Sequence, residues 1–341
     1  MKLLAIETSC DETAAAVVQD GRHILSNAIA SQIEMHRVYG GVVPELASRS
    51  HIATISQITK QALAEANLDL SQIDGIAVTA APGLIGALLV GLNFAKGLAF
   101  GQNLPLIPVH HVRGHIASNY LSHPDLAPPF LCLCVSGGTT TLVEVETYTQ
   151  MKILGSTRDD AVGECFDKVA RVLGIGYPGG KPLDDLAQGG DPKAYPLPRG
   201  KVDNAPLDMS FSGLKTASIN LIHNHQQKEE ALHLPNFAAS FSQAVCDVLL
   251  PRILLAVEKT GQRKLAIAGG VSANTQLRKN LRDLCQGKGI SLYLPELSLC
   301  GDNAAMIGAQ GFYQYQAGLV APWDLNASAT WDLSQELTGK K

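Results

Sequence analysis

One order of predicted elements occurs twice along the chain, and this repeat limits the fold more than any other feature. In the first part, short apolar runs bounded by a polar loop and by the turn Asp20-Gly21 predict three antiparallel strands. Apolar residues then recur at helical spacing, and a strand, a second helix and a further strand follow. The expected strands are Leu3–Ile6, Ala14–Val18, Ile24–Ile29, Ile73–Thr79 and Leu106–Val109, and the expected helices are Glu45–Ala66 and one that starts at Leu84.

The second part repeats this order with a different sequence. Three apolar runs precede a helix that Gly174 closes as a C-terminal cap, and a buried strand leads later into another helix. Residues 189–212 are rich in Pro, Gly and charge, which predicts a long surface loop or insertion. The expected strands are Phe130–Val135, Thr141–Glu146, Met151–Ser156 and Leu265–Ala268, and the expected helices are Val162–Leu173, Phe237–Glu258, one after Asn274, and Asp302–Tyr315.

A duplicated βββαβα unit predicts an α/β protein with two lobes around a cleft, whose functional loops lie at the strand ends facing that cleft. The expected N-terminal lobe contains residues 1–109 and 302–322. The expected C-terminal lobe contains residues 110–301, with the insertion near 189–212. Residues 323–341 are expected to form a loosely ordered tail.

The composition excludes several classes of protein. Of the 341 residues, 46% are hydrophobic and 17% charged, so the chain can bury large cores. Its net charge of −4 means that binding a nucleic acid would need a local basic patch or a partner. Seven cysteines without a Cys-x-x-Cys pair indicate a reduced, cytoplasmic protein. The N-terminus reaches Glu7 too early for a signal peptide, and Leu84–Phe100 is too short to span a membrane, so we expect no membrane association.

The stretch from His110 to His115 is the first candidate for chemistry. If it opens a helix, His111 and His115 lie four residues apart on one face and can share a metal ion. The alternative is a pair of ordinary polar residues at a helix start. A metalloprotease needs Glu directly after the first His, and Val112 stands there, so this stretch provides no hydrolytic base.

Other candidates lie in loops. The loop Glu7–Thr13 offers hydroxyls and the carboxylates of Asp11 and Glu12. The turn Ser136–Thr140 contains Gly137 and Gly138, whose N–H groups suit an anion, although most such turns bind nothing. The segment Gly269–Asn274 joins a buried strand to a helix start, where a nucleotide can pack against backbone.

Three carboxylates complete the candidate set. Asp167 on a predicted helix and Asp184 after the Gly179-Gly180 pair suit ribose hydroxyls, and a solvated helix face is the alternative for Asp167. Asp302 stands where a helix N-cap is expected, and capping would explain it. Two His and one carboxylate are also a common catalytic metal set.

Seven motifs in order resemble the tRNA N6-adenosine threonylcarbamoyltransferase family, once misnamed O-sialoglycoprotein endopeptidase. The resemblance runs from about Leu3 through Tyr315. The motifs are Glu7–Thr13, Gly40–Arg49, His111 with His115, Ser136-Gly137-Gly138, Gly179-Gly180, Gly269–Asn274 and Gly301–Ala304.

The resemblance implies the actin-like, Hsp70 and sugar-kinase superfamily, with two RNase H-like lobes. It implies transfer of a threonylcarbamoyl group from threonylcarbamoyl-adenylate to N6 of adenosine 37 in tRNAs that read codons starting with A. The implied metal ligands for one divalent ion, Fe²⁺ first and Zn²⁺ second, are His111, His115 and Asp302. The implied donor-binding residues are Cys134, Val135, Ser136, Gly137, Gly138, Asp167, Gly180, Asp184 and Asn274.

Several expectations accompany this resemblance. Asp11 or Glu12 is expected to accept the proton of the amine. Thr139 stands where the family usually has His, so any role of that His is absent here. The expected partners are tRNA, a paralogous partner subunit and a small ATPase of the same pathway. The alternatives are an ATP-dependent small-molecule kinase of the superfamily, a metalloprotease, and a scaffold paralogue, which would be expected to lack the metal ligands.

Overall fold

The computed structural model describes residues 1–335, and these form two compact units. Of the described residues, unit 1 contains 1–128, 145–152 and 295–335, and unit 2 contains 129–144 and 153–294. This division differs from the expected one, which assigned residues 110–128, 145–152 and 295–301 to the C-terminal lobe. The difference arises because helix α4 (His111–Ser122) packs on helix α10 (Ala304–Gln316).

Unit 1 is built on a five-stranded mixed sheet in the order β3-β2-β1-β4-β5. The first three strands form the predicted antiparallel meander, and β1 also pairs in parallel with β4. The strands are β1 (Lys2–Glu7), β2 (Glu12–Gln19), β3 (His23–Ser31), β4 (Gly75–Ala81) and β5 (Leu106–His110).

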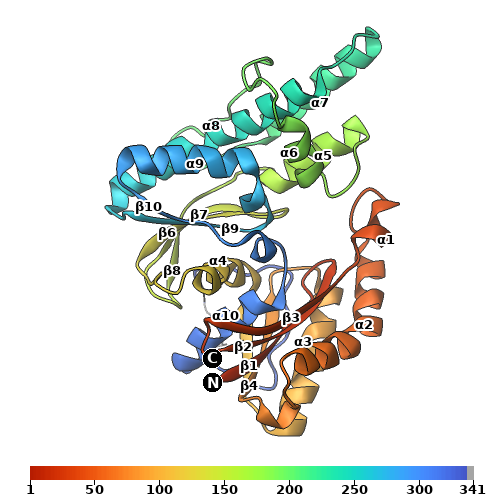
Figure 1. Ribbon diagram of the computed structural model, residues 1–341, viewed down its shortest axis with the longest axis vertical. Helices are drawn as coiled ribbons and strands as arrows, with labels where there is room; N and C mark the ends of the chain where they lie inside the picture. The colour runs from red at the N-terminus through yellow and green to blue at the C-terminus, as the bar shows by residue number, and fades with distance from the viewer. Residues whose placement is uncertain (336–341) are drawn as a thin grey trace. The chain divides into compact units, whose positions relative to one another are not determined.

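Both faces of this sheet are buried because its central strands are apolar at nearly every position. Leu3 and Ala5 face one core, which α10 fills with Met306 and Ile307. Leu4 and Ile6 point to the opposite face, which the larger helices cover (Figure 1). The other elements here are α1 (Ile33–Arg37), α2 (Pro44–Glu65), α3 (Ile85–Gln102) and the short 3-10 helices η1 (Leu70–Gln72) and η3 (Leu297–Leu299).

The second sheet has the order β10-β9-β6-β7-β8. Its strands are β6 (Phe130–Val135), β7 (Thr140–Val145), β8 (Met151–Ser156), β9 (Lys264–Ala268) and β10 (Ser291–Tyr293). Read from its other edge, the second sheet has the order β8-β7-β6-β9-β10. Strands β6 to β10 therefore occupy the positions that β1 to β5 occupy in the first sheet. The predicted duplication is therefore confirmed.

The helices of unit 2 enclose one large apolar core, in which Phe166 and Phe241 meet edge to face. Residues 188–211 contain no helix, as expected of the insertion, and only an isolated bridge between Thr157 and Met209. The helices are α5 (Val162–Leu173), α6 (Gly180–Ala187), α7 (Ser212–Gln227), α8 (Leu234–Thr260), α9 (Thr275–Lys288) and the 3-10 helix η2 (Gly270–Ala273). Helices α1, α6 and α7 and strand β10 were not predicted.

Two helices, α3 and α8, are long and apolar enough to cross a membrane by length and composition alone. Helix α8 is largely buried in the core of unit 2. Helix α3 buries Leu88 and Leu92 but exposes Ile85 and Phe100. The prediction of a core helix at Leu84–Phe100 is therefore right for one face only.

The prediction of a loosely ordered tail is wrong for residues 323–335. This segment lies along unit 1 through backbone hydrogen bonds, in which Ser328 N donates to Ala80 O at 3.0 Å and Gly83 N donates to Ala329 O at 3.2 Å. Leu333 is buried. Residues 336–341 lie outside the described part of the chain.

Candidate metal and substrate site

The helix that carries the two candidate ligands begins at His111, as the sequence predicts. His110 is its N-cap, and its Nδ1 accepts a hydrogen bond from Val112 N at 3.2 Å. Its Nε2 lies 3.2 Å from the carbonyl oxygen of Trp331. Burial lowers the pKa of His110 to about 3. His110 is therefore a neutral structural residue at the helix start, and both its nitrogens are engaged by backbone groups.

His111, His115 and Asp302 lie together in unit 1, with one ligand atom of each within 4.8 Å of the others. Asp302 Oδ1 is 3.5 Å from His111 Nε2 and 3.1 Å from His115 Nε2. The helix cap that could have explained Asp302 is its neighbour Asn303, whose side chain accepts from Met306 N at 3.0 Å. The capping explanation for Asp302 is therefore wrong.

The donor set fits a divalent cation. His115 is 2% exposed, and its Nε2 lies 3.1 Å from Oδ1 of Asp302. Because the same oxygen lies 3.5 Å from His111 Nε2, a cation could take the place of the protons between these three groups. Two imidazoles and one carboxylate with open positions are typical of catalytic zinc and non-haem iron sites.

Glu7 contacts His111 on the ring nitrogen that faces away from Asp302, a role that the sequence did not predict. Its side chain is fully buried at the end of β1. Oε2 lies 3.0 Å from His111 Nδ1 and accepts from Thr79 Oγ1 at 2.6 Å, and Oε1 accepts from Ser9 N. A carboxylate on Nδ1 leaves Nε2 of His111 available for a metal ion, which is the usual arrangement behind metal-bound histidines. The only sequence signal was an acidic residue that ends a buried apolar strand.

The charges of this cluster stabilise one another. Burial disfavours the charged form of Asp302, but His111 and His115 outweigh it and hold the pKa of the carboxyl far below its usual value. Burial likewise opposes the charge of Glu7, and His111 offsets it, so the pKa of Glu7 is also lowered. Burial opposes imidazolium at His111, yet Asp302 and Glu7 raise its pKa to about 9. A cation at Nε2 would replace this proton.

The loop between β1 and β2 lies beside the cluster. Ser9 Oγ is 3.0 Å from His111 Nδ1. Buried His51 holds the loop, with its Nδ1 2.8 Å from Thr13 Oγ1 and its Nε2 2.9 Å from Cys10 O. Asp11 is 8% exposed. Burial and the neighbouring charges of Asp11 and Asp302 raise the pKa of Glu12 well above its usual value.

In unit 2 the predicted glycine-rich loops meet. Gly163 N, at the start of α5, donates to Ser136 O at 3.1 Å. Gly269 has a φ of +91°, and a Cβ there would lie 2.4 Å from Val135 O. Gly137 and Gly138 remain exposed, with open space around each, whereas Cys134 and Val135 are buried in β6. Cys134 and Val135 therefore offer a ligand only backbone groups.

The remaining candidates connect three helices of unit 2. Asp167 on α5 accepts from Gly179 N at 2.7 Å, next to Gly180. Asp184 on α6 accepts from Thr275 N at 3.0 Å and from Thr275 Oγ1 at 2.8 Å. Asn274 caps α9 through Leu277 N, and its Nδ2 is buried without a hydrogen-bond partner in the described chain. The unpaired amide is the group in this cluster that most needs a ligand.

A family model described as tRNA N6-adenosine threonylcarbamoyltransferase matches residues 23–309. The chain belongs to this family. A member from Clostridium beijerinckii is 50% identical over 333 residues, which cover 98% of each chain. A member from Moorella thermoacetica is 51% identical over 325 residues, 95% of each chain. The family assignment made from the seven motifs is confirmed.

Solved structures at low identity show the fold. The HypF protein of T. kodakarensis matches with a TM-score of 0.62 at 14% identity, over 93% of this chain and 48% of its own. Component A of the Acidaminococcus fermentans (R)-2-hydroxyglutaryl-CoA dehydratase matches with a TM-score of 0.54 at 16% identity, over 93% of this chain and 98% of its own. The chain shares the fold of these proteins, and its two mixed sheets with helices are the predicted α/β architecture. The kinase alternative gains nothing beyond this shared fold.

Proposed function

We propose that this chain transfers a threonylcarbamoyl group to N6 of adenosine in tRNA, the reaction that names its family. The observation that carries the proposal is the cluster of buried His115 with half-buried His111 and Asp302, held by Glu7, in a chain half identical to members of that family. The donor is threonylcarbamoyl-adenylate, and the acceptor is adenosine 37 of tRNAs that read codons starting with A. The proposed location is the cytoplasm, without a membrane.

The donor binds to the glycine-rich loops of unit 2. The exposed N–H groups of Gly137 and Gly138 receive the phosphate, because open glycine turns suit anions. The nucleoside contacts Asp167, Gly180 and Asp184, and the unpaired Nδ2 of Asn274 donates to it. Thr139 is occupied by the turn itself, since its N donates to Ser136 Oγ at 3.1 Å and its carbonyl accepts from Ser136 N at 2.8 Å.

One divalent ion would be held by His111, His115 and Asp302, with Fe²⁺ as the first candidate and Zn²⁺ as the second. When bound, it would supply Lewis-acid stabilisation of negative charge that develops in the reaction. Glu7 and Ser9 orient His111 for this role through Nδ1.

In the transfer, N6 of the adenosine forms a bond to the carbamoyl carbon, and the bond from that carbon to the phosphate oxygen breaks. AMP leaves with the electron pair. The amine proton passes to Asp11 or Glu12, and the raised pKa of Glu12 favours Asp11 as the acceptor. Orientation of the two substrates supplies a large part of the rate. The donor comes from a separate enzyme, and a paralogous partner subunit and a small ATPase assist the cycle.

The test is reconstitution of the transfer. The chain is incubated with unmodified tRNA, threonine, bicarbonate, ATP and the partner proteins, and the tRNA is digested to nucleosides. We expect threonylcarbamoyladenosine with the wild type. His111→Ala should lose the bound metal, measured by elemental analysis, and the transfer activity. His223→Ala, an exposed histidine on α7, is the matched control and should keep both.

Two outcomes would contradict the proposal. Full metal content and full transfer activity in His111→Ala would remove the metal assignment. Absence of modified adenosine in every combination of partners would remove the transfer activity itself.

A further inference from the structure

The positive charge of the chain is concentrated in one segment. Residues 259–288 contain seven Lys and Arg against one Asp, a formal charge of +6 in a chain whose net charge is −4. The rest of the chain therefore carries −10. A local excess of this size is the electrostatic pattern expected of a surface for a polyanion.

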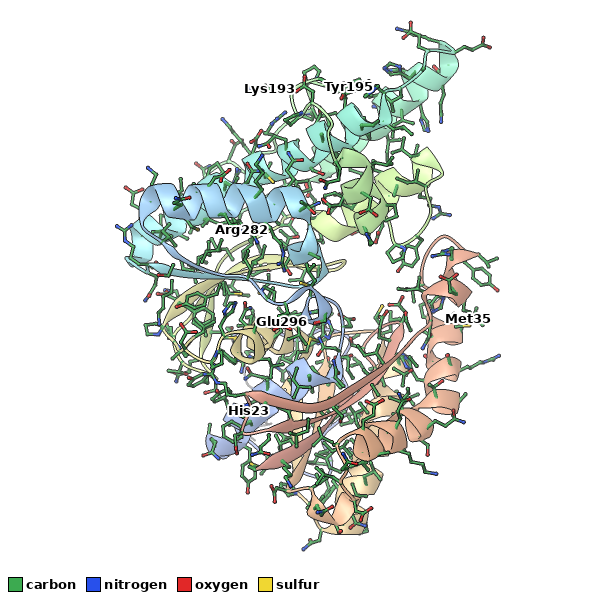
Figure 2. All side chains as sticks on the ribbon, viewed as in Figure 1. His23, Met35, Lys193, Tyr195, Arg282 and Glu296 are labelled. Carbon is green, nitrogen blue, oxygen red and sulfur yellow. The ribbon has the colours of Figure 1, made fainter. Side chains whose placement is uncertain are left out.

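Five of the seven cations in this segment have exposed side chains. These five form no ion pair within the described residues, whereas cations elsewhere, such as Arg158, Lys168 and Lys215, do. Figure 2 shows Arg282 on α9. We define the α9 surface as the exposed residues Lys259, Arg263, Lys279, Arg282 and Lys288.

The packing of α9 keeps these side chains in solvent. Leu277, Leu281 and Cys285 form its buried face and belong to the core of unit 2. Lys279 and Arg282 are three residues apart on the outer side, where such residues are neighbours. With 14 residues, α9 is about 21 Å long. It starts beside Asn274 and ends at Lys288, so the surface extends away from the proposed nucleoside contact.

The far end of the helix carries further charge. Arg263 Nη1 donates to Lys288 O at 3.2 Å. The parallel pairing of Lys264 in β9 with Ser291 in β10 brings the ends of α8 and α9 to the same edge of the sheet. Cations at a helix C-terminus also complement its dipole, which accounts for Arg263 and Lys288 without a ligand. The dipole does not account for Lys279 and Arg282, which lie in the middle of α9.

We propose that the α9 surface binds the sugar-phosphate backbone of the tRNA and directs it toward the donor-binding loops of unit 2. The inference rests on the proposed function, because tRNA is the polyanion that this activity requires. The contacts are to phosphates, so they position the tRNA and carry no sequence information. An acidic protein partner is the competing ligand.

The test compares Lys279→Gln/Arg282→Gln with Lys193→Gln in the complete transfer system. Lys193 is an exposed lysine of the same unit on the 188–211 insertion, away from α9 (Figure 2). The α9 variant should raise the tRNA Kd about tenfold or more near physiological salt. It should also reduce the slope of log K against log salt by about 2. The KM for the donor and the metal content should stay unchanged, and Lys193→Gln should match the wild type.

The outcomes separate this inference from the proposed function. If the wild type transfers and the α9 variant keeps the wild-type Kd and salt slope, the docking surface is wrong and the function stands. If the variant instead loses a partner protein on size-exclusion chromatography with its tRNA affinity intact, the surface binds an acidic protein and the inference is overturned. If the wild type neither binds nor modifies tRNA, the proposed function fails as well.

Discussion

Glu7 is the residue on which the geometry of His111 depends. Its carboxylate is fully buried. The hydrogen-bond partners given above that stabilise its negative charge are His111, Ser9 N and Thr79, and none of them is a Lys or an Arg. A carboxylate in this position fixes the tautomer and orientation of a metal-binding imidazole. Burial of the Glu7 carboxylate costs free energy, and in the proposed metal site that carboxylate fixes the orientation of His111.

We predict that Glu7→Gln weakens metal binding by about 10-fold to 100-fold, because an amide is a poorer acceptor for Nδ1–H and can present its NH₂ group instead. Competition with a chromogenic chelator measures the affinity. Glu34→Gln is the matched control, since Glu34 is exposed and its one ion pair within residues 1–335 is with Arg37. Equal metal affinity of Glu7→Gln and the wild type would show that Glu7 does not orient His111.

The sequence singled out His111, His115 and Asp302, which the structure brings together, but it did not predict the contact of Glu7 with His111. His111 and His115 could be paired because helical spacing alone places them on one face. Asp302 was ambiguous because an acid before a helix has a common structural explanation, and only the structure shows that Asn303 takes the cap. Glu7, Ser9 and Thr79 converge from different strands and loops, and local sequence patterns contain no information about such contacts.

At the scale of elements, glycines set the distance between α4, α10 and the first sheet. A Cβ on Gly114 would lie 2.7 Å from Ile307 Cδ1. A Cβ on Gly308 would lie 2.7 Å from Val18 Cγ2 and 2.9 Å from Val18 Cβ. Because His115 is on α4 and Asp302 precedes α10, this close packing also determines whether the three ligands meet.

We predict that Gly308→Ala lowers the free energy of unfolding by about 1–3 kcal/mol, since the added methyl group overpacks a core that β-branched Val18 cannot vacate. Urea denaturation measures the change. Gly97→Ala in α3 is the control, because a Cβ there meets no atom within 4 Å. It should be neutral or stabilising, as Ala favours a helix by up to about 1 kcal/mol over Gly. A Gly308→Ala protein as stable as the wild type would contradict this account.

Most strands and the long helices could be predicted because each has a clear apolar period. Helix α7 could not, since Ser, Asn and His alternate with its few apolar residues and only Leu214, Ser218 and Ile222 are buried. Strand β10 has three residues and a weak signal. Both depend on tertiary packing rather than on local preference.

On the scale of the whole molecule, the end of the chain returns to α4. Arg113 is 2% exposed, and its guanidinium donates to Leu333 O at 3.0 Å and 2.7 Å, to Gln335 O at 3.1 Å and to Thr149 O at 3.0 Å. Tyr148, next to Thr149 in the turn between β7 and β8, stacks on Tyr313 of α10 with 3.8 Å between the ring centroids. Such long-range contacts explain why the sequence predicted the duplication but not the division of the chain into units.

We predict that ending the chain after Pro322 destabilises the protein by about 3–5 kcal/mol, because the buried charge of Arg113 then loses its carbonyl acceptors from the tail. Denaturant unfolding measures the loss. In the shortened chain, Arg113→Met should restore part of the stability, whereas in the full chain the same substitution should reduce it. A shortened chain with wild-type stability would mean that the tail contributes nothing to α4.

The separation of the ligands along the sequence has a consequence for biosynthesis. Asp302 is made 187 positions after His115, which at translation rates of about 5–20 residues per second is roughly 10–40 s later. During that interval the two histidines leave the ribosome without their carboxylate. An ion that needs all three proposed ligands would therefore be loaded only after nearly the whole polypeptide has been made.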